Sequence, residues 1–173
     1  MIKVSEIQKL TGEGHYNVSC PIGYLKGKIE EWQKNLSLEL NPDFQRGHIW
    51  TIEQQIGFVE FILRGGKTSA FQFNHPEWMN SFKGEFVCVD GLQRLTALLK
   101  FLNNELPVFN GNYLKDFDDP ALLLRTYDVY IRINDLKTRK EVLQWYLELN
   151  DGGTPHTSEE INKVKELLKT ETK

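Results

Sequence analysis

The sequence predicts a mixed α and β fold in a single domain, and three observations support this. Segments with the 3.6-residue apolar spacing of helices alternate along the chain with short, strand-like apolar runs. The length of 173 residues is typical of one domain. A chain of this size can bury about 70% of its unfolded surface. No internal repeat, low-complexity segment or linker interrupts the order. We therefore expect residues 1–173 to form one α+β domain.

Helical and strand patterns succeed each other in the first part of the chain. Residues 23–35 have apolar side chains at helical spacing, and residues 36–40 alternate leucine with polar residues, which predicts a short half-buried strand. A helix is expected over residues 51–64. Thr51 and Gln54 form its capping box, and Gly65 is its expected C-cap.

The second part of the chain continues the alternation. Residues 69–73 and 85–90 are strand-like, and the latter run is apolar on both faces, which predicts a central strand. Residues 107–124 are irregular until their end. We also expect a helix at 91–104 and a strand at 127–135. A further helix should begin at 136 and end at Gly152, and a last helix should begin near Thr157, with Glu160 in its capping box.

Composition and charge limit the cellular compartment and the partners that we expect. The formal net charge is −3, so no overall basic field holds nucleic acid, and any DNA contact must come from a local patch. Cys20 and Cys88 are too few for a disulfide scaffold, which favours a reducing compartment. The N-terminus lacks a signal-peptide core, and no run approaches the roughly 18 apolar residues of a membrane span. We expect a cytoplasmic protein with no membrane partner.

The stretch VCVDGLQR, residues 87–94, allows two interpretations. Asp90 can be the N-cap of the following helix, with Gln93 reaching back in a capping-box arrangement. That interpretation leaves Gly91 at N1 and Arg94 near the positive end of the helix dipole unexplained. Both fit a bound anion, because glycine allows close approach of backbone N–H groups and arginine is a bidentate phosphate donor. The turn is therefore a candidate phosphate site.

The loop NPDFQRGHIW, residues 41–50, gathers functional side chains just before a helix. Phe44 and Trp50 are expected as core anchors. Arg46 is either a surface charge or a partner of Asp43, and His48 alone is a weak candidate for acid or base chemistry. Neither the two cysteines nor the four histidines have metal-ligand spacing, so we infer no structural zinc.

Three stretches, PDFQRGHIW, VDGLQRLTAL and ELNDGGTPHTSEE, together resemble one family. They are similar to the DGQQR-motif domains of the GmrSD type, also catalogued as domain of unknown function 262, a branch of the ParB and sulfiredoxin-like fold. The resemblance covers about residues 38–160. It implies a compact α+β domain with a small mixed sheet flanked by helices, and a nucleotide at the strand-to-helix turn.

The resemblance also implies chemistry. Relatives hydrolyse nucleoside triphosphates and act, within larger enzymes, in DNA restriction or cleavage; in the ParB branch the equivalent turn holds CTP. It implies a nucleoside triphosphate of unspecified base, with Mg²⁺, as cofactor. Asp90 is the candidate to orient water or Mg²⁺, and Arg46 and Arg94 are candidates to neutralise phosphate charge. The nucleotide-binding candidates by motif position are Asp43, Gln45, Arg46, Gly91, Gln93, Arg94, Asn150, Gly152 and Gly153.

Two departures from the family pattern leave the activity open. Leu92 stands where the family commonly has glutamine, and leucine makes no amide hydrogen bonds, so binding can survive where hydrolysis is weakened. GmrSD-type enzymes carry a C-terminal nuclease module, and we expect none in the short segment that follows the motif stretches. Three functions remain open. The first is an NTPase that acts in DNA restriction or DNA processing. The second is a regulator that senses a nucleotide or DNA, or that inhibits a larger restriction or defence protein, and the third is a DNA-binding module that uses Arg64 and Lys67.

Overall fold

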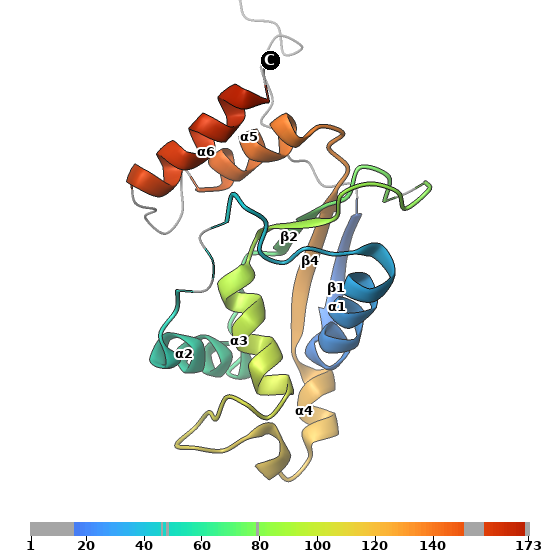
Figure 1. Cartoon of the computed structure of the whole chain (residues 1–173). Helices are drawn as coiled ribbons and strands as arrows, with labels where there is room; N and C mark the ends of the chain where they lie inside the picture. The colour runs from blue at the N-terminus through green and yellow to red at the C-terminus, as the bar shows by residue number, and fades with distance from the viewer. Residues whose placement is uncertain (1–15, 46, 48, 79, 151–157, 172–173) are drawn as a thin grey trace, which may run out of the picture.

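A four-stranded mixed sheet is the centre of the computed structural model, which describes residues 16–45, 47, 49–78, 80–150 and 158–171 (Figure 1). Strand β4 pairs antiparallel with β1 and parallel with β2, and β3 pairs antiparallel with β2. The predicted α+β class with a small mixed sheet is confirmed. The strands in sheet order are β1 (Tyr16–Pro21), β4 (Asp128–Asn134), β2 (Phe71–Asn74) and β3 (Val87–Asp90).

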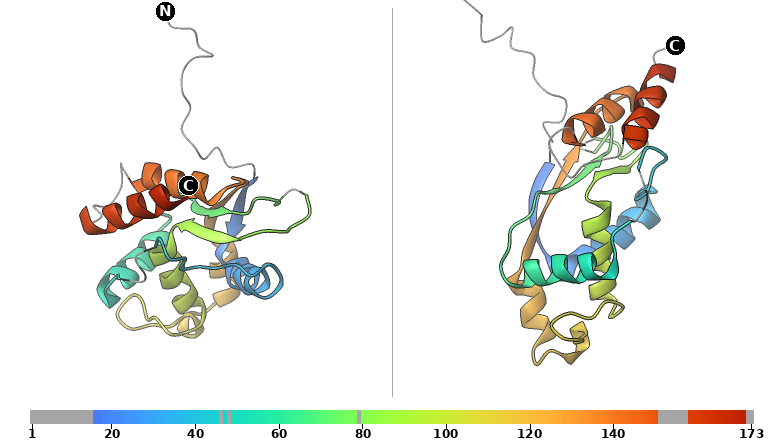
Figure 2. Two further views of the ribbon diagram at one scale, coloured as in Figure 1. Left: turned by 45° about the horizontal axis from the view of Figure 1, so that its top comes forward. Right: turned by 90° about the vertical axis from the view of Figure 1, so that its left-hand side faces the viewer.

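Helices cover the sheet unequally on its two sides. One buried cluster joins the sheet to the first three helices, and a smaller one joins β3 to the last two helices. Figure 2 shows the last two helices on the opposite side of the sheet from the first three. In the described residues the helices are α1 (Ile22–Leu36), α2 (Ile52–Leu63), α3 (Leu92–Leu102), α4 (Pro120–Thr126), α5 (Arg139–Asn150) and α6 (Ser158–Thr170), with a 3-10 turn at Leu114–Asp116.

Strand β3 lies between the two clusters, because its side chains alternate between them. Cys88 packs in the larger cluster, and Val87 and Val89 pack in the smaller one against α5 and α6. The expectation that this run is apolar on both faces is therefore confirmed. The expectation that it is central in the sheet is wrong, because β3 is an edge strand covered by helices on both faces.

The outer edge of β3 is covered by a loop. Glu39 N donates to Phe86 O at 2.8 Å, and Cys88 N donates to Glu39 O at 2.9 Å. These bonds satisfy edge groups that would otherwise pair with another chain. The predicted strand at residues 36–40 is wrong, because only an isolated bridge between Glu39 and Val87 forms. Ser37, with φ 54°, turns the chain at the end of α1.

Strand β1 was not predicted from the sequence. Its alternate residues Tyr16, Val18 and Cys20 belong to the larger cluster or pack against it. The strand is recognisable only through its antiparallel pairing with β4. The predicted strand at 127–135 and the irregular stretch before it are both confirmed.

Helix ends follow local chemistry where the sequence signals are strong. The Thr51 and Gln54 capping box is present, with Gln54 N donating to Thr51 Oγ1 and Thr51 N to Gln54 Oε1. Arg64, not Gly65, is the C-cap of α2, and Gly65 follows it with φ 85°. Helix α5 ends at Asn150. The predicted helix end at Gly152 and the predicted cap at Thr157 lie outside the described residues. None of the described helices combines the length and apolar character needed to cross a bilayer.

Candidate functional site

The turn between β3 and α3 has an unusual backbone. Gly91 is the N-cap of α3, with φ 108°, and no side chain caps the helix. The interpretation of Asp90 as N-cap with Gln93 in a capping box is therefore wrong, and Gly91 lies at the N-cap rather than N1. A Cβ at position 91 would lie 2.7 Å from Phe71 Cδ1, so packing as well as the positive φ requires glycine. The first turn of α3 thus begins with N–H groups that no side chain caps.

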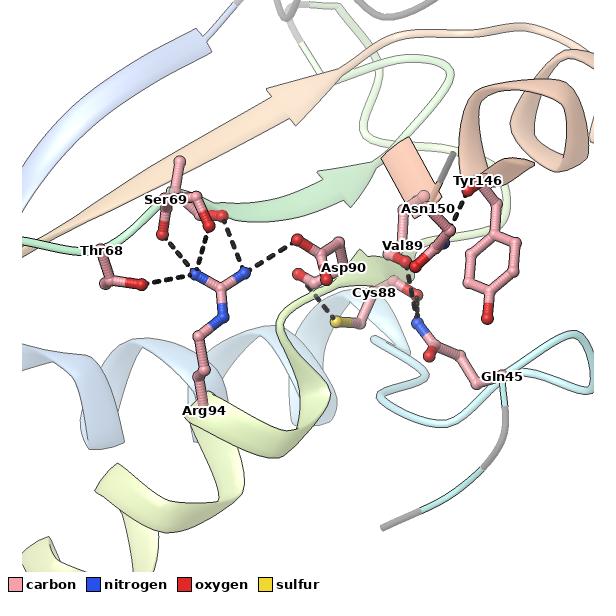
Figure 3. Close-up of polar contacts among 10 residues, drawn as sticks. Gln45, Thr68, Ser69, Cys88, Val89, Asp90, Arg94, Tyr146 and Asn150 are labelled. Atoms are coloured by element: carbon pink, nitrogen blue, oxygen red, sulfur yellow. Dashed lines mark hydrogen bonds and ion pairs between the residues drawn. The ribbon is translucent and has the colours of Figure 1, made fainter. Parts of the chain in front are cut away.

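Arg94 is bound on one side of this turn (Figure 3). Its guanidinium donates to Thr68 Oγ1 at 2.9 Å, to Ser69 Oγ at 2.7 Å, and to the carbonyl oxygens of Ser69 and Ala70. The same group lies over the Phe71 ring at 5.4 Å. With its side chain only 12% exposed, Arg94 fastens α3 to residues 68–71. This clamp was not predicted from the sequence.

Asp90 completes the clamp while remaining within reach of solvent. Arg94 Nη2 donates to Asp90 Oδ2 at 2.8 Å, and the Asp90 side chain is 39% exposed. The ion pair holds the carboxylate at the end of β3, where a ligand at the turn can meet it. Leu92, at the position where the family commonly has glutamine, is only 7% exposed. That position therefore contributes to packing.

Gln93 binds the loop on the other side of the turn. Its Oε1 accepts from Ile49 N at 2.8 Å and from Trp50 N at 3.1 Å, and its Nε2 donates to Gly47 O. These three bonds hold Gly47, Ile49 and Trp50 against the start of α3. Gln93 is thus a bridge between the two predicted motif stretches.

Gln45 makes the reciprocal bridge from the loop to the strand. Its Nε2 donates to Cys88 O at 3.1 Å and to Val89 O at 3.0 Å, directly before Asp90 (Figure 3). Through Gln45 and Gln93, the described residues of the first two motif stretches lie together. Arg46 and His48 themselves lie outside the described residues.

Two partners hold Asp43 in the same loop. Its carboxylate pairs with Arg139, which also pairs with Glu85 and Glu171 at 3.3 and 3.4 Å. Lys163 Nζ donates to Asp43 O at 2.6 Å. Arg139 and Lys163 were not identified from the sequence. No local spacing indicates a pairing between segments so far apart.

The aromatic residues of the loop pack as expected. Phe44 is buried and contacts the Tyr146 ring at 5.2 Å, and Trp50 packs against Phe58 at 5.5 Å. Asn150 Nδ2 donates to Tyr146 O at 2.6 Å, so this residue of the third stretch lies at the end of the helix that holds Phe44. Gly152 and Gly153 lie outside the described residues.

The remaining candidate groups are the Cys88 thiol, the end of α2 and possible metal ligands. Burial raises the pKa of the Cys88 thiol far above its usual range, so Cys88 is a packed neutral group rather than a nucleophile. Arg64 has a 68% exposed side chain and lies over the Phe109 ring. Gly65 and Gly66 end α2 through backbone bonds to Ile62 O and Phe61 O. In the part of the chain that the structure describes, no group of three histidine, cysteine, aspartate or glutamate residues could hold a metal ion.

Comparisons with known proteins support the assignment of the motifs. The sequence model of the GmrSD restriction endonuclease, N-terminal domain, matches residues 29–122. This range contains the loop at 41–50, strands β2 and β3, and helix α3. Comparisons with curated proteins and with solved structures gave no match. Because the matched range covers more than half of the chain, the protein belongs to the family of GmrSD restriction endonuclease N-terminal domains.

Proposed function

We propose that the protein binds a nucleoside triphosphate at the turn between β3 and α3 and hydrolyses it with Mg²⁺, in a process linked to DNA restriction or DNA processing. The observation that carries the proposal is the start of α3, where Gly91 replaces a side-chain cap. Gln45 bonds to the end of β3, and Gln93 holds Ile49 and Trp50 alongside the helix. Uncapped N–H groups at the positive end of a helix dipole favour a phosphate. The link to DNA rests on the family.

Each charged group at the turn has a proposed part. Asp90 orients the attacking water or a Mg²⁺ ion, because its carboxylate is fixed on one side and reachable on the other. Arg94 positions Asp90 and supplies positive charge near the phosphates, although its donors already have protein acceptors. By motif position, Arg46 is the proposed direct phosphate donor. Asp43, Gln45, Gln93 and Asn150 hold the surrounding loop and helix, and Gly152 and Gly153 are proposed to complete the site.

The phosphate part of the proposal can be tested without side-chain changes. Inorganic tripolyphosphate, added to the ¹⁵N-labelled chain, should shift the backbone amide signals of Leu92, Gln93 and Arg94 more than those of the α2 start, residues 52–54. Helix α2 provides a matched control, because its N-terminus is capped by Thr51. Equal shifts at both helix starts would remove the proposed site.

The hydrolytic part is tested through Asp90. Phosphate release from ATP, GTP, CTP and UTP should depend on Mg²⁺ and fall at least about tenfold in Asp90→Asn, as expected when a group that orients the nucleophile is lost. Asp118→Asn is the control, because Asp118 is exposed and far along the chain, in the segment before α4. Equal turnover in the two variants would count against Asp90. Stimulation by duplex DNA tests the link to DNA processing.

A second candidate function is nucleotide sensing without turnover, as a regulator or inhibitor of a larger restriction or defence protein. It is favoured by Leu92, which gives this chain one amide side chain fewer in its motif than the family commonly has. Calorimetry showing tight binding, together with phosphate release no faster than in Asp90→Asn, would support it. Rapid turnover by the unmodified chain would exclude it.

A further inference from the structure

A pocket of about 250 Å³ lies between the 43–45 segment and α6. Phe44 and Gln45 line it from the loop, and Glu160 and Lys163 line it from the helix. Binding pockets for whole drug-sized ligands start at roughly 300 Å³, so this one fits a sugar-sized fragment better than a complete nucleotide. A ligand that occupies it would have to extend outside.

The pocket adjoins the turn where phosphate binding is proposed. Gln45 is common to both, because it lines the pocket and donates to Cys88 O and Val89 O directly before Asp90. Phe44 is fixed as a wall by its contact with Tyr146. Gln45 therefore links the pocket to the end of β3, the strand that leads into the Gly91 turn.

The charges of the lining indicate which end of the ligand enters. A glutamate carboxylate only accepts hydrogen bonds and repels phosphate, so Glu160 selects hydroxyl or N–H donors. Lys163 is held at the side of the pocket by its bond to Asp43 O at 2.6 Å. Phe44 offers an apolar surface. This combination suits an uncharged, hydroxyl-bearing group next to a charged one.

We propose that this pocket is the ribose subsite of the nucleotide site, with Glu160 accepting hydrogen bonds from the 2′- and 3′-hydroxyls. This inference rests on the proposed function, since the triphosphate must reach the Gly91 turn. All four ribonucleotides present the same hydroxyl pair, whereas base donors differ. Acidic side chains hydrogen-bond ribose hydroxyls in other nucleotide-binding folds. The protein should therefore distinguish the sugar more strongly than the base.

Calorimetry on the full chain with Mg²⁺ tests the assignment. The ligands are the four ribonucleoside triphosphates, their 2′,3′-dideoxy counterparts and inorganic tripolyphosphate. The unmodified chain should bind each ribonucleotide about tenfold to a hundredfold more tightly than the dideoxy form, the range expected for hydrogen bonds to a charged acceptor. Glu160→Gln should lose most of this ratio, and its tripolyphosphate affinity should change no more than that of Glu159→Gln, which removes the same charge.

Glu159→Gln is the matched control, because it removes the same charge from the adjacent, exposed residue of the same helix turn. It should keep the full ratio between ribose and dideoxyribose. Thermal unfolding of both variants establishes that α6 is intact. Glu160→Asp, which keeps the charge but shortens the side chain, should give an intermediate ratio.

Three outcomes would overturn the subsite. The first is equal affinity for ribose and dideoxy forms in the unmodified chain, and the second is an equal ratio in Glu160→Gln and Glu159→Gln. The third is a preference for one base that does not depend on the sugar, which would assign the pocket to the base. None of these affects tripolyphosphate binding, so the phosphate site would stand. Failure of tripolyphosphate itself to bind would instead contradict the proposed function.

Discussion

Gln93 and Arg94 are neighbours in one motif, yet they hold opposite sides of the β3–α3 turn in different ways. Arg94 forms a charged, nearly buried clamp to Asp90 and residues 68–70. Gln93 forms neutral bonds to the more exposed backbone of residues 47–50. Buried charged contacts are costly to break one partner at a time, whereas exposed neutral bonds exchange with water at small cost. Loss of a partner should therefore cost more on the Arg94 side than on the Gln93 side.

The largest expected effect is on the Arg94 side. Arg94→Met should lower the free energy of unfolding by about 2–4 kcal/mol, because it leaves Asp90 and four further acceptors without their donor. Arg64→Met is the control; its exposed side chain forms a weak pair with Glu60, at 3.8 Å, and lies over the Phe109 ring, so the change should cost less than about 1 kcal/mol. Urea denaturation measures both. Similar losses in the two variants would mean that Arg94 is not a structural clamp.

The second largest loss in the free energy of unfolding is expected for a change at Leu92, which lies between the N-cap and Gln93. Leu92→Gln restores the residue common in the family but places an amide at a buried position, which should cost about 1–3 kcal/mol. If this position only packs, phosphate release should not increase. Denaturation and turnover measured on the same sample separate the two effects. A gain of tenfold or more in turnover would assign a catalytic part to that amide instead.

Gln93→Ala should have a smaller effect on stability and a larger local one. The loss of three bonds to partly exposed backbone should cost about 1 kcal/mol. Hydrogen exchange at Ile49 and Trp50 should become faster, because their N–H groups lose their acceptor. Gln144→Ala is the control, since Gln144 is exposed and its side chain donates to Glu148 within the same helix. Unchanged exchange at Ile49 would show that the loop is held by other contacts.

The smallest effect is expected for Ser69→Ala. This change removes one hydroxyl acceptor from Arg94 at an exposed position, and the other acceptors remain, so the cost should be at most about 0.5 kcal/mol. Thermal unfolding is sensitive enough to compare it with Arg94→Met. A loss close to that of Arg94→Met would place most of the clamp in a single hydrogen bond and contradict the distributed arrangement.

Local signals in the sequence were sufficient for much of this fold. The Thr51 and Gln54 capping box and the helical spacing of residues 52–63 depend on neighbours within one or two turns, so the sequence determined α2 by itself. The first two motif stretches lie within the matched residues 29–122 and likewise identified the family, and the density of polar residues at 43–50 favoured a functional role for this loop.

Tertiary structure decided the questions in which several partners were possible. Asp90 and Gln93 could have capped α3. Instead, Arg94 binds Asp90, and the backbone of Ile49 and Trp50, which is distant in sequence, binds Gln93. Strand β3 became an edge strand, because the loop at Glu39 bonds to its outer edge where a neighbouring strand was expected. A hydrogen-bonding group pairs with whichever partner the fold brings closest. The sequence determines that such groups exist, and long-range packing decides which of them meet.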